Sequence, residues 1–280
     1  MIFAVFFFSL MNVGVKMLRH IPAAEIVFFR SIISFFISIT ILKHAKVNIF
    51  GNNKKILIAR GLAGAVALIL YFQMIQEIPL ASAYVILFLA PIFTTILGIF
   101  IVKEKVHPLQ WVFSGIAFTG ILMVQGFDNR VPLYHLFLGI GASIASGLAY
   151  NFIRVLKDSE HPLVIIFYFP LVTAPITGLI SYFNWKTPSG MDWVYLLSVG
   201  VLTQIAQYFM TKSYQMEELS KVASIRYLGI VYAISFGYVF FDESYSIVIY
   251  LGMMLVLVGV FLNIWFKHRL HRDQSIFSGD

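Results

Sequence analysis

The second half of this sequence repeats the first at a constant offset of 139 residues, and that repeat constrains the fold most. Each half contains five long apolar runs. Because five is odd, two such halves would enter a bilayer from opposite sides, and inverted repeats of this kind are typical of secondary transporters. Polar residues and glycines coincide at the offset without a gap, in the pairs Asn12 and Asn151, Gly61 and Gly200, Gln76 and Gln215, Gly98 and Gly237, Glu104 and Glu243, and Gly120 and Gly259.

The composition excludes a soluble protein. The 280 residues are 60% hydrophobic and 12% charged, whereas soluble domains carry roughly 25% charged residues. The net charge of +7 does not indicate a nucleic-acid partner, because the cations lie in short loops between apolar runs, as in cytoplasmic loops of membrane proteins. The sequence has no cysteine, which excludes disulfides, thiolate metal sites and cysteine nucleophiles.

A bilayer-spanning helix needs about 20 apolar residues. The runs therefore predict an all-α polytopic membrane protein with ten transmembrane helices, arranged as two inverted five-helix repeats over residues 1–126 and 132–266. We expect the polar residues 267–280 to form a frayed cytoplasmic tail. The predicted helices are 1–18, 22–42, 56–76, 80–102, 108–125, 132–155, 162–184, 191–212, 219–241 and 245–266.

The distribution of Lys and Arg predicts the orientation. With the N-terminus inside, fourteen of these residues fall in the inner loops and tail, and four fall in the outer loops: Lys16, Arg19, Arg130 and Lys186. Cytoplasmic loops are enriched in Lys and Arg. We therefore expect a multi-pass protein of the plasma (inner) membrane with both termini in the cytoplasm. The sequence leaves open whether it is a monomer or a homodimer.

Two arginines lie well inside predicted helices. Arg30 is nine residues into the run 22–42 from the outside, and Arg226 is eight residues into the run 219–241 from the inside. At 1.5 Å per residue, each lies roughly 10–12 Å deep. Ionisable residues at such depth are costly and commonly functional, so either guanidinium could bind an anionic group of a substrate. The alternative is that each extends to its interface or bonds backbone carbonyls.

Uncharged polar residues recur at helical spacing. Gln204, Gln207 and Tyr208, followed by Thr211, share one face of the run 191–212. Gly139, Ser143 and Gly147 share a face of the run 132–155 with Asn151, and small residues of this kind favour close helix contact. The symmetry partners Asn12 and Asn151 could be substrate ligands or structural anchors. Gln73 and Tyr84 are further candidates for a cavity.

Prolines and glutamates mark positions where a helix could bend or end. Pro91, Pro170 and Pro175 interrupt apolar runs and permit bends. Glu104 and Glu243 end their helices, where a carboxylate opposes the helix dipole and requires a partner. Lys103 and Lys105 flank Glu104, but Glu243 has no neighbouring cation, so we expect a basic group from elsewhere in the chain to bind it.

Over nearly its whole length the chain resembles the drug/metabolite transporter (DMT) superfamily, EamA-type family. The first half carries Ala81-Ser82-Ala83, Pro91, Glu104 and Gly120 in the family's order and spacing. The second half keeps Glu243 and the glycines Gly252 and Gly259, but has Gly229-Ile230 in place of the proline. The resemblance implies a ten-helix carrier that cycles by alternating access, with a central cavity bounded by the third, fourth, eighth and ninth helices and their neighbours. Phe28-Phe29-Arg30 and Arg226-Tyr227 resemble a bacterial subgroup that includes S-adenosylmethionine carriers, which adds Tyr227 to the candidate ligands.

The sequence thus predicts a secondary carrier, embedded in the lipid bilayer, for a small-molecule substrate: an amino acid, an S-adenosylmethionine-like or a nucleotide-like compound. An integral-membrane enzyme is the main alternative, but the seven histidines are scattered among separate loops, and no cofactor or metal site is expected. A non-transporting membrane subunit is the other alternative. Because no Asp or Glu lies near the predicted midplane, we expect exchange or facilitated transport without direct proton coupling.

Overall fold

The computed structural model describes residues 1–103, 106–216 and 228–278, and the regular secondary structure of this part is entirely helical. The first half comprises α1 (Ile2–Met17), α2 (Ala23–His44), α3 (Lys54–Glu77), α4 (Leu80–Leu87), α5 (Ala90–Ile101) and α6 (Pro108–Phe127). The second half comprises α7 (Leu133–Leu156), α8 (Pro162–Tyr182), α9 (Asp192–Met216), α11 (Leu228–Phe241) and α12 (Ile247–Ser278).

Local sequence signals set several helix starts. The ring Nδ1 of His107 accepts a hydrogen bond from the Leu109 amide at the start of α6, and Nδ1 of His161 accepts one from the Leu163 amide at the start of α8, each at 3.2 Å. In both helices a proline follows the histidine, and proline is favoured at the first helical position because its missing N–H would have no partner there. These two helices therefore begin where the sequence predicts.

The predicted helix 80–102 is broken. It consists of α4 and α5, separated by Phe88 and Leu89. Pro91 lies at the start of α5, and because it has no backbone N–H it cannot bond the carbonyl of Leu87, four residues earlier. Pro170 and Pro175, by contrast, lie inside α8, which continues through both.

The C-terminal segment differs from its prediction. We expected a frayed tail from residue 267 onward, but α12 continues without interruption to Ser278. Extending an existing helix adds one hydrogen bond per residue without a new nucleation cost, so the membrane helix carries the polar segment with it.

Most of the helices could span a membrane. Counting Leu80–Ile101 as one span, eight helices of the described part are long and apolar enough, and α1 and α11 are shorter apolar helices. The structure thus shows a multi-pass, all-helical membrane protein. The predicted total of ten spans stays a prediction, because α1 is shorter than these eight and the predicted helix 219–241 begins in residues outside the described part.

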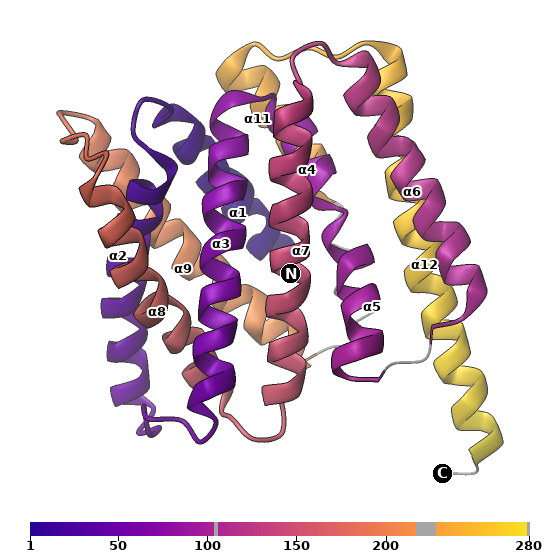
Figure 1. Ribbon diagram of the computed structural model, residues 1–280, viewed down its shortest axis with the longest axis horizontal. Helices are drawn as coiled ribbons and strands as arrows, with labels where there is room; N and C mark the ends of the chain where they lie inside the picture. Colours follow the sequence, from indigo (N-terminus) through magenta and orange to yellow (C-terminus); the bar gives the residue numbers. More distant parts are fainter. Residues whose placement is uncertain (104–105, 217–227, 279–280) are drawn as a thin grey trace.

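The helices pack in pairs, as Figure 1 shows. α6 and α12 lie along each other at one edge, α2 and α8 pair near the opposite edge, and α3 packs against α7 as α1 packs against α9. A Cβ added at Gly120 would lie 2.6 Å from the Gly252 carbonyl oxygen, so the α6 and α12 backbones touch. A Cβ added at Gly147 would lie 2.8 Å from the Thr94 amide nitrogen, which confirms that the small residues of α7 allow close approach to another helix.

The bundle has two ends, which we name from Figure 1. The upper end contains the loops 18–22, 128–132, 183–191 and 242–246, and the lower end contains the loops 45–53 and 157–161. All four cations predicted for the outer loops (Lys16, Arg19, Arg130 and Lys186) lie in or beside the upper loops. The core runs between the ends and consists mainly of buried aliphatic side chains such as Ile26, Ile75 and Ile86.

Candidate functional site

Three of the candidate residues line a single pocket. Arg30 from α2 meets Gln204 and Gln207 from α9 there. The pocket lies between α2, α3, α8 and α9, so it joins helices of both halves. Two of these helices, α3 and α9, are among the four that the family resemblance indicated, and α2 and α8 are their neighbours in the sequence. The other lining residues are Ser34, Ser38, Arg60, Ile166, Phe169, Pro170 and Thr203.

Arg30 is held firmly in this pocket. Its side chain is 4% exposed, and Nε donates a hydrogen bond to Oγ1 of Thr203 at 3.1 Å. Its guanidinium carbon lies 5.5 Å from the ring centroid of Phe169. Beside it, Nε2 of Gln204 donates to Oγ of Ser38 at 3.1 Å. Arg30 therefore does not extend to the membrane interface, one of the alternatives that the sequence left open.

Sequence reasoning missed the second arginine of the pocket. Arg60 is one of the fourteen cations that the orientation count places on the inner side, but it is the seventh residue of α3, and its side chain lies 4.5 Å from the same Phe169 ring. Its Nε and Nη1 atoms are buried without a hydrogen-bond partner. The usable signal was its position: Arg60 lies inside the predicted run 56–76, one helical turn from its start.

The two symmetric asparagines make bonds within the protein. Nδ2 of Asn12 donates to the Tyr71 hydroxyl at 3.1 Å. Nδ2 of Asn151 donates to the carbonyl oxygens of Thr94 and Gly147 at 3.0 and 2.9 Å. Both side chains are buried, at 3% and 0% exposure, and neither Oδ1 atom has a partner. The amide of Asn151 thus ties α7 to α5, which favours the anchor interpretation over direct contact with a substrate.

The remaining candidates are dispersed. Gln73 donates from Nε2 to the Tyr134 hydroxyl at 3.2 Å. Tyr84 packs against α11, where a Cβ on Gly229 would lie 2.1 Å from the Tyr84 hydroxyl, so only glycine fits at this point of close contact. Tyr208 is 57% exposed. Arg226 and Tyr227 lie outside the described residues.

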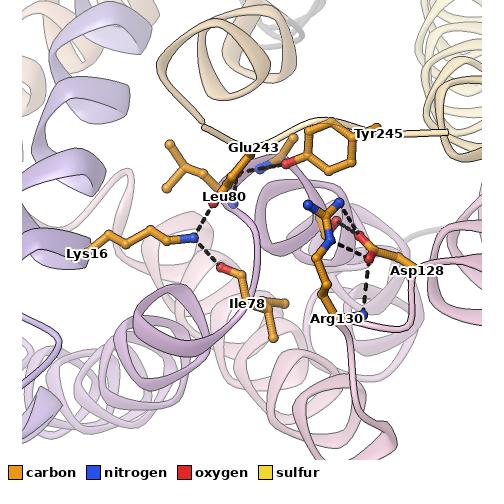
Figure 2. A network of polar contacts seen from close by, with 9 residues as sticks. Lys16, Ile78, Leu80, Asp128, Arg130, Glu243 and Tyr245 are labelled. Carbon is orange, nitrogen blue, oxygen red and sulfur yellow. Dashed lines mark hydrogen bonds and ion pairs between the residues drawn. The ribbon is translucent and has the colours of Figure 1, made fainter. Parts of the chain in front are cut away.

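A second cluster of charged residues lies at the upper end (Figure 2). The Glu243 carboxylate accepts hydrogen bonds from Lys16 Nζ, from the Leu80 amide at 2.8 Å and from the Tyr245 hydroxyl at 2.9 Å. Nζ of Lys16 also donates to the carbonyl oxygen of Ile78 at 2.6 Å. Lys16 is thus the basic group from elsewhere in the chain that the sequence predicted for Glu243. We call Lys16, Glu243 and Tyr245 the upper cluster.

An adjoining ion pair extends the upper cluster. The Asp128 carboxylate accepts bonds from Nε and Nη2 of Arg130 at 2.8 and 3.2 Å, and from Oγ of Ser82 at 3.0 Å. The Asp128 hydrogen bond raises the pKa of Arg130 above its ordinary value. The Arg130 guanidinium lies 4.9 Å from the ring centroid of Tyr245, so the pair contacts the upper cluster directly (Figure 2).

The upper cluster joins separate parts of the chain. Lys16 lies in the last turn of α1, Leu80 begins α4, and Glu243 follows α11, so the carboxylate of one residue of the second half bonds two elements of the first. The Lys16 and Glu243 side chains are 12% and 7% exposed. Breaking a buried ion pair by removing one partner costs about 3–5 kcal/mol. Within the described part, no three His, Asp or Glu side chains gather closely enough to hold a metal ion.

Comparison with known proteins gives a family match and several relatives. The sequence model of the EamA-like transporter family matches residues 1–125 and 133–265. The pseudopaline exporter CntI of Pseudomonas aeruginosa (strain UCBPP-PA14) is 29% identical, over 92% of each chain. The S-adenosylmethionine uptake transporter of Rickettsia felis is 27% identical, over 78% of this chain and 75% of its own.

More distant similarity extends to animals and to a solved structure. Mouse solute carrier family 35 member G1 is 26% identical, over 86% of this chain and 71% of its own. A protein of known crystal structure aligns with a TM-score of 0.65 over 96% of this chain and 98% of its own, at 16% identity. At that identity the alignment shows a shared fold and nothing about the substrate.

Proposed function

The chain belongs to the EamA-like transporter family, and we propose that it is a secondary carrier that moves a small polar metabolite by alternating access. Its relatives are named as transporters, and the chain folds as a multi-pass membrane protein, which supports a membrane transporter.

We infer ten spans in two inverted halves. Shifting α2, α3 and α6 by 139 residues gives starts at 162, 193 and 247, against observed starts of 162, 192 and 247 for α8, α9 and α12. Lys103 and Asp242, also 139 residues apart, both adopt positive φ, at 56° and 52°. Reciprocal packing of α1 on α9 and of α7 on α3 further supports two equivalent halves.

The single observation that carries the proposal is the upper cluster. Because Glu243 of the second half bonds Lys16 and the Leu80 amide of the first, the two halves are fastened together at one end of the bundle. A carrier with alternating access must open and close each end in turn by moving one half against the other. We therefore assign the upper cluster as the outer gate, in its closed state.

The orientation follows from the charges. The upper end is the outer side in this proposal, because the lower loops and their flanking helix ends hold most of the cations, including Lys43, Lys54 and Lys157. Both termini are then cytoplasmic, and the membrane is the plasma (inner) membrane.

The proposed substrate carries an anionic or zwitterionic group. Arg30, Gln204 and Gln207 would contact it, together with Arg226 and Tyr227. Two relatives are named for pseudopaline and S-adenosylmethionine, which supports a polar metabolite without choosing one. Transport would be exchange or facilitated diffusion.

Uptake and counterflow in liposomes test the proposal. Purified full-length protein is reconstituted and offered labelled amino acids, S-adenosylmethionine and nucleotide derivatives. We expect saturable counterflow for at least one compound. Correctly inserted, monodisperse protein that gives no counterflow with any of them contradicts a carrier of this class, and flux that requires a pH gradient contradicts exchange.

A further inference from the structure

The pocket between α2, α3, α8 and α9 has an unusual charge balance. It contains two guanidiniums, Arg30 and Arg60, which contact the same Phe169 ring. Within the described part of the chain, no Asp or Glu lines it. The other polar lining residues, Ser34, Ser38, Thr203, Gln204 and Gln207, are uncharged, so they do not neutralise the two cations. Charged groups buried at membrane depth are expensive unless they are paired.

Several donors in this pocket lack an acceptor. Nε and Nη1 of Arg60 are buried with no hydrogen-bond partner, and so is Oγ of Ser34. Oγ1 of Thr203 accepts from Arg30 and is a neutral partner that leaves the positive charge uncompensated. An arginine side chain has five donors and no acceptor, so what this pocket lacks is an acceptor that carries negative charge.

The size of the pocket limits what can fill it. The space inside is about 20 Å³, and a cavity needs roughly 10–15 Å³ to hold one water molecule. A whole metabolite does not fit in this conformation. A single halide ion or the end of a carboxylate does.

We propose that Arg30 and Arg60 bind one compact monovalent anionic group in this pocket, with Ser34 as an additional donor. The group is either a free halide ion or the carboxylate of a substrate. It would bridge α2 and α3 of the first half to α8 and α9 of the second, and would stabilise the closed contact between the halves. Binding to the resting protein is measured without transport, so this inference can fail while the proposed function stands.

Thermal unfolding of the purified full-length protein in uncharged detergent tests the site. Sodium chloride and sodium formate are each titrated against sodium isethionate at constant ionic strength, because isethionate carries no carboxylate and its sulfonate group is bulkier than a halide ion or a carboxylate. We expect a saturable rise in the unfolding midpoint. A response to chloride identifies the free ion as the source of the group, and a response to formate alone identifies a carboxylate. No saturable response to either salt overturns the proposal.

Two variants localise the effect. We expect Arg60→Gln and Ser34→Val each to weaken the apparent anion affinity at least tenfold. Arg60→Gln also removes a cation whose buried Nε and Nη1 atoms have no partner, so in isethionate the variant should unfold at a higher temperature than the wild type. Chloride or formate should reduce or reverse this difference in unfolding midpoint, because only the wild type gains from the bound anion. Arg19→Gln, which removes an exposed cation at the upper end, is the matched control and should leave the affinity unchanged.

The same two variants can also overturn the proposal. An anion response that is unchanged in both Arg60→Gln and Ser34→Val places the binding elsewhere and overturns the proposal. Should Arg60→Gln fail to fold, Ser34→Val still occupies the space without changing any charge. Line broadening of ³⁵Cl in nuclear magnetic resonance of the wild type, reversed by bromide, would report halide binding without any variant.

Discussion

The Arg30 guanidinium lies 5.5 Å from the ring centroid of Phe169, which is the residue 139 positions further along and hence the counterpart of Arg30 in the second half. Arg30 and Phe169 are thus one pair of corresponding positions that differ in charge, and the two side chains are in direct contact. Arg60 contacts the same ring at 4.5 Å, and its counterpart is Val199. Two differences between the halves therefore meet in one pocket, which lies between the corresponding helices α2 and α8 and the corresponding helices α3 and α9.

Replacing Phe169 tests this contact. Cation–π contacts contribute roughly 0.5–2 kcal/mol each, more when they are desolvated. We expect Phe169→Leu to lower the free energy of unfolding by about 1–3 kcal/mol, because it removes the ring from both arginines. Phe169→Tyr keeps the ring and should cost much less. Thermal unfolding in detergent measures both, and equal losses in the two variants would contradict a role for the ring face.

The sequence predicts part of this pocket and misses the rest for physical reasons. Arg30, Gln204 and Gln207 could be found because depth and helical spacing are local properties. Arg60 could not be found in this way, because it lies only one turn from a helix end. The sequence does not show whether the side chain of such a cation faces the pocket or the membrane interface. Which way it turns depends on Phe169, more than a hundred residues away.

The upper cluster also depends on a contact between distant residues that the sequence alone does not predict. The position of Glu243 at a helix end predicts a basic partner, but Lys16 is 227 residues away in the sequence, and only the packed fold selects it from the available cations. The helix starts of α2, α3 and α6 recur in the second half because each depends on short-range signals such as capping residues and prolines. The polar composition of residues 267–280 predicts a frayed tail, and this prediction is wrong, because α12 continues to Ser278.

Breaking the upper cluster should open the upper end. The chain has no cysteine, so a single Ala83→Cys reporter in α4, at a residue with 0% exposure, gives an unambiguous labelling site. We expect Lys16→Met and Glu243→Gln each to increase the rate of outside labelling by a membrane-impermeant maleimide at least tenfold. The physical reason is the loss of about 3–5 kcal/mol when one member of a buried pair is removed.

Arg19→Met is the matched control for labelling. Arg19 is an exposed cation at the same end, three residues beyond Lys16, and its removal should leave the labelling rate within about twofold of the wild type, as expected for a surface charge. If all three variants label alike, or if none labels faster, the upper cluster is not what closes this end.

Two glycines of α6 provide a matched pair for helix contact. A Cβ at Gly120 would lie 2.6 Å from the Gly252 carbonyl oxygen and 2.7 Å from the Val256 amide nitrogen, whereas a Cβ at Gly115 would meet nothing within 4 Å. We expect Gly120→Ala to lower the unfolding midpoint, because the backbones of α6 and α12 must separate. Gly115→Ala should be neutral or stabilising by up to about 1 kcal/mol, because alanine is the better helix former.

The change from glycine to alanine raises helix propensity equally in both variants. The difference between their unfolding midpoints therefore reports only the contact of α6 with α12 at Gly120. Unfolding midpoints in detergent, measured side by side, decide it. A Gly120→Ala midpoint at or above that of Gly115→Ala would mean that α6 and α12 do not touch at this point in the folded protein.

Deprotonation of the Tyr245 hydroxyl should lower the free energy of unfolding at alkaline pH. Burial, the neighbouring Glu243 carboxylate and the hydrogen bond to it raise the pKa of the Tyr245 hydroxyl above its ordinary value. Between the ordinary pKa of about 10 and the raised one, the folded protein holds a proton that the unfolded chain has lost. The stability from this proton is therefore complete below about pH 10 and declines as pH rises, by at most about 1.4 kcal/mol per pH unit.

The comparison with Tyr245→Phe isolates this group. At neutral pH the variant should be less stable, by about 1–3 kcal/mol, because Glu243 loses a hydrogen-bond donor. Above about pH 10 the gap between wild type and variant should narrow, because the variant has no hydroxyl to titrate. Tyr238→Phe, at a residue that is 67% exposed, should show no such narrowing. Unfolding midpoints from pH 8 to about pH 11 measure the gap, and a gap that stays constant would mean that Tyr245 does not bond Glu243 through a retained proton.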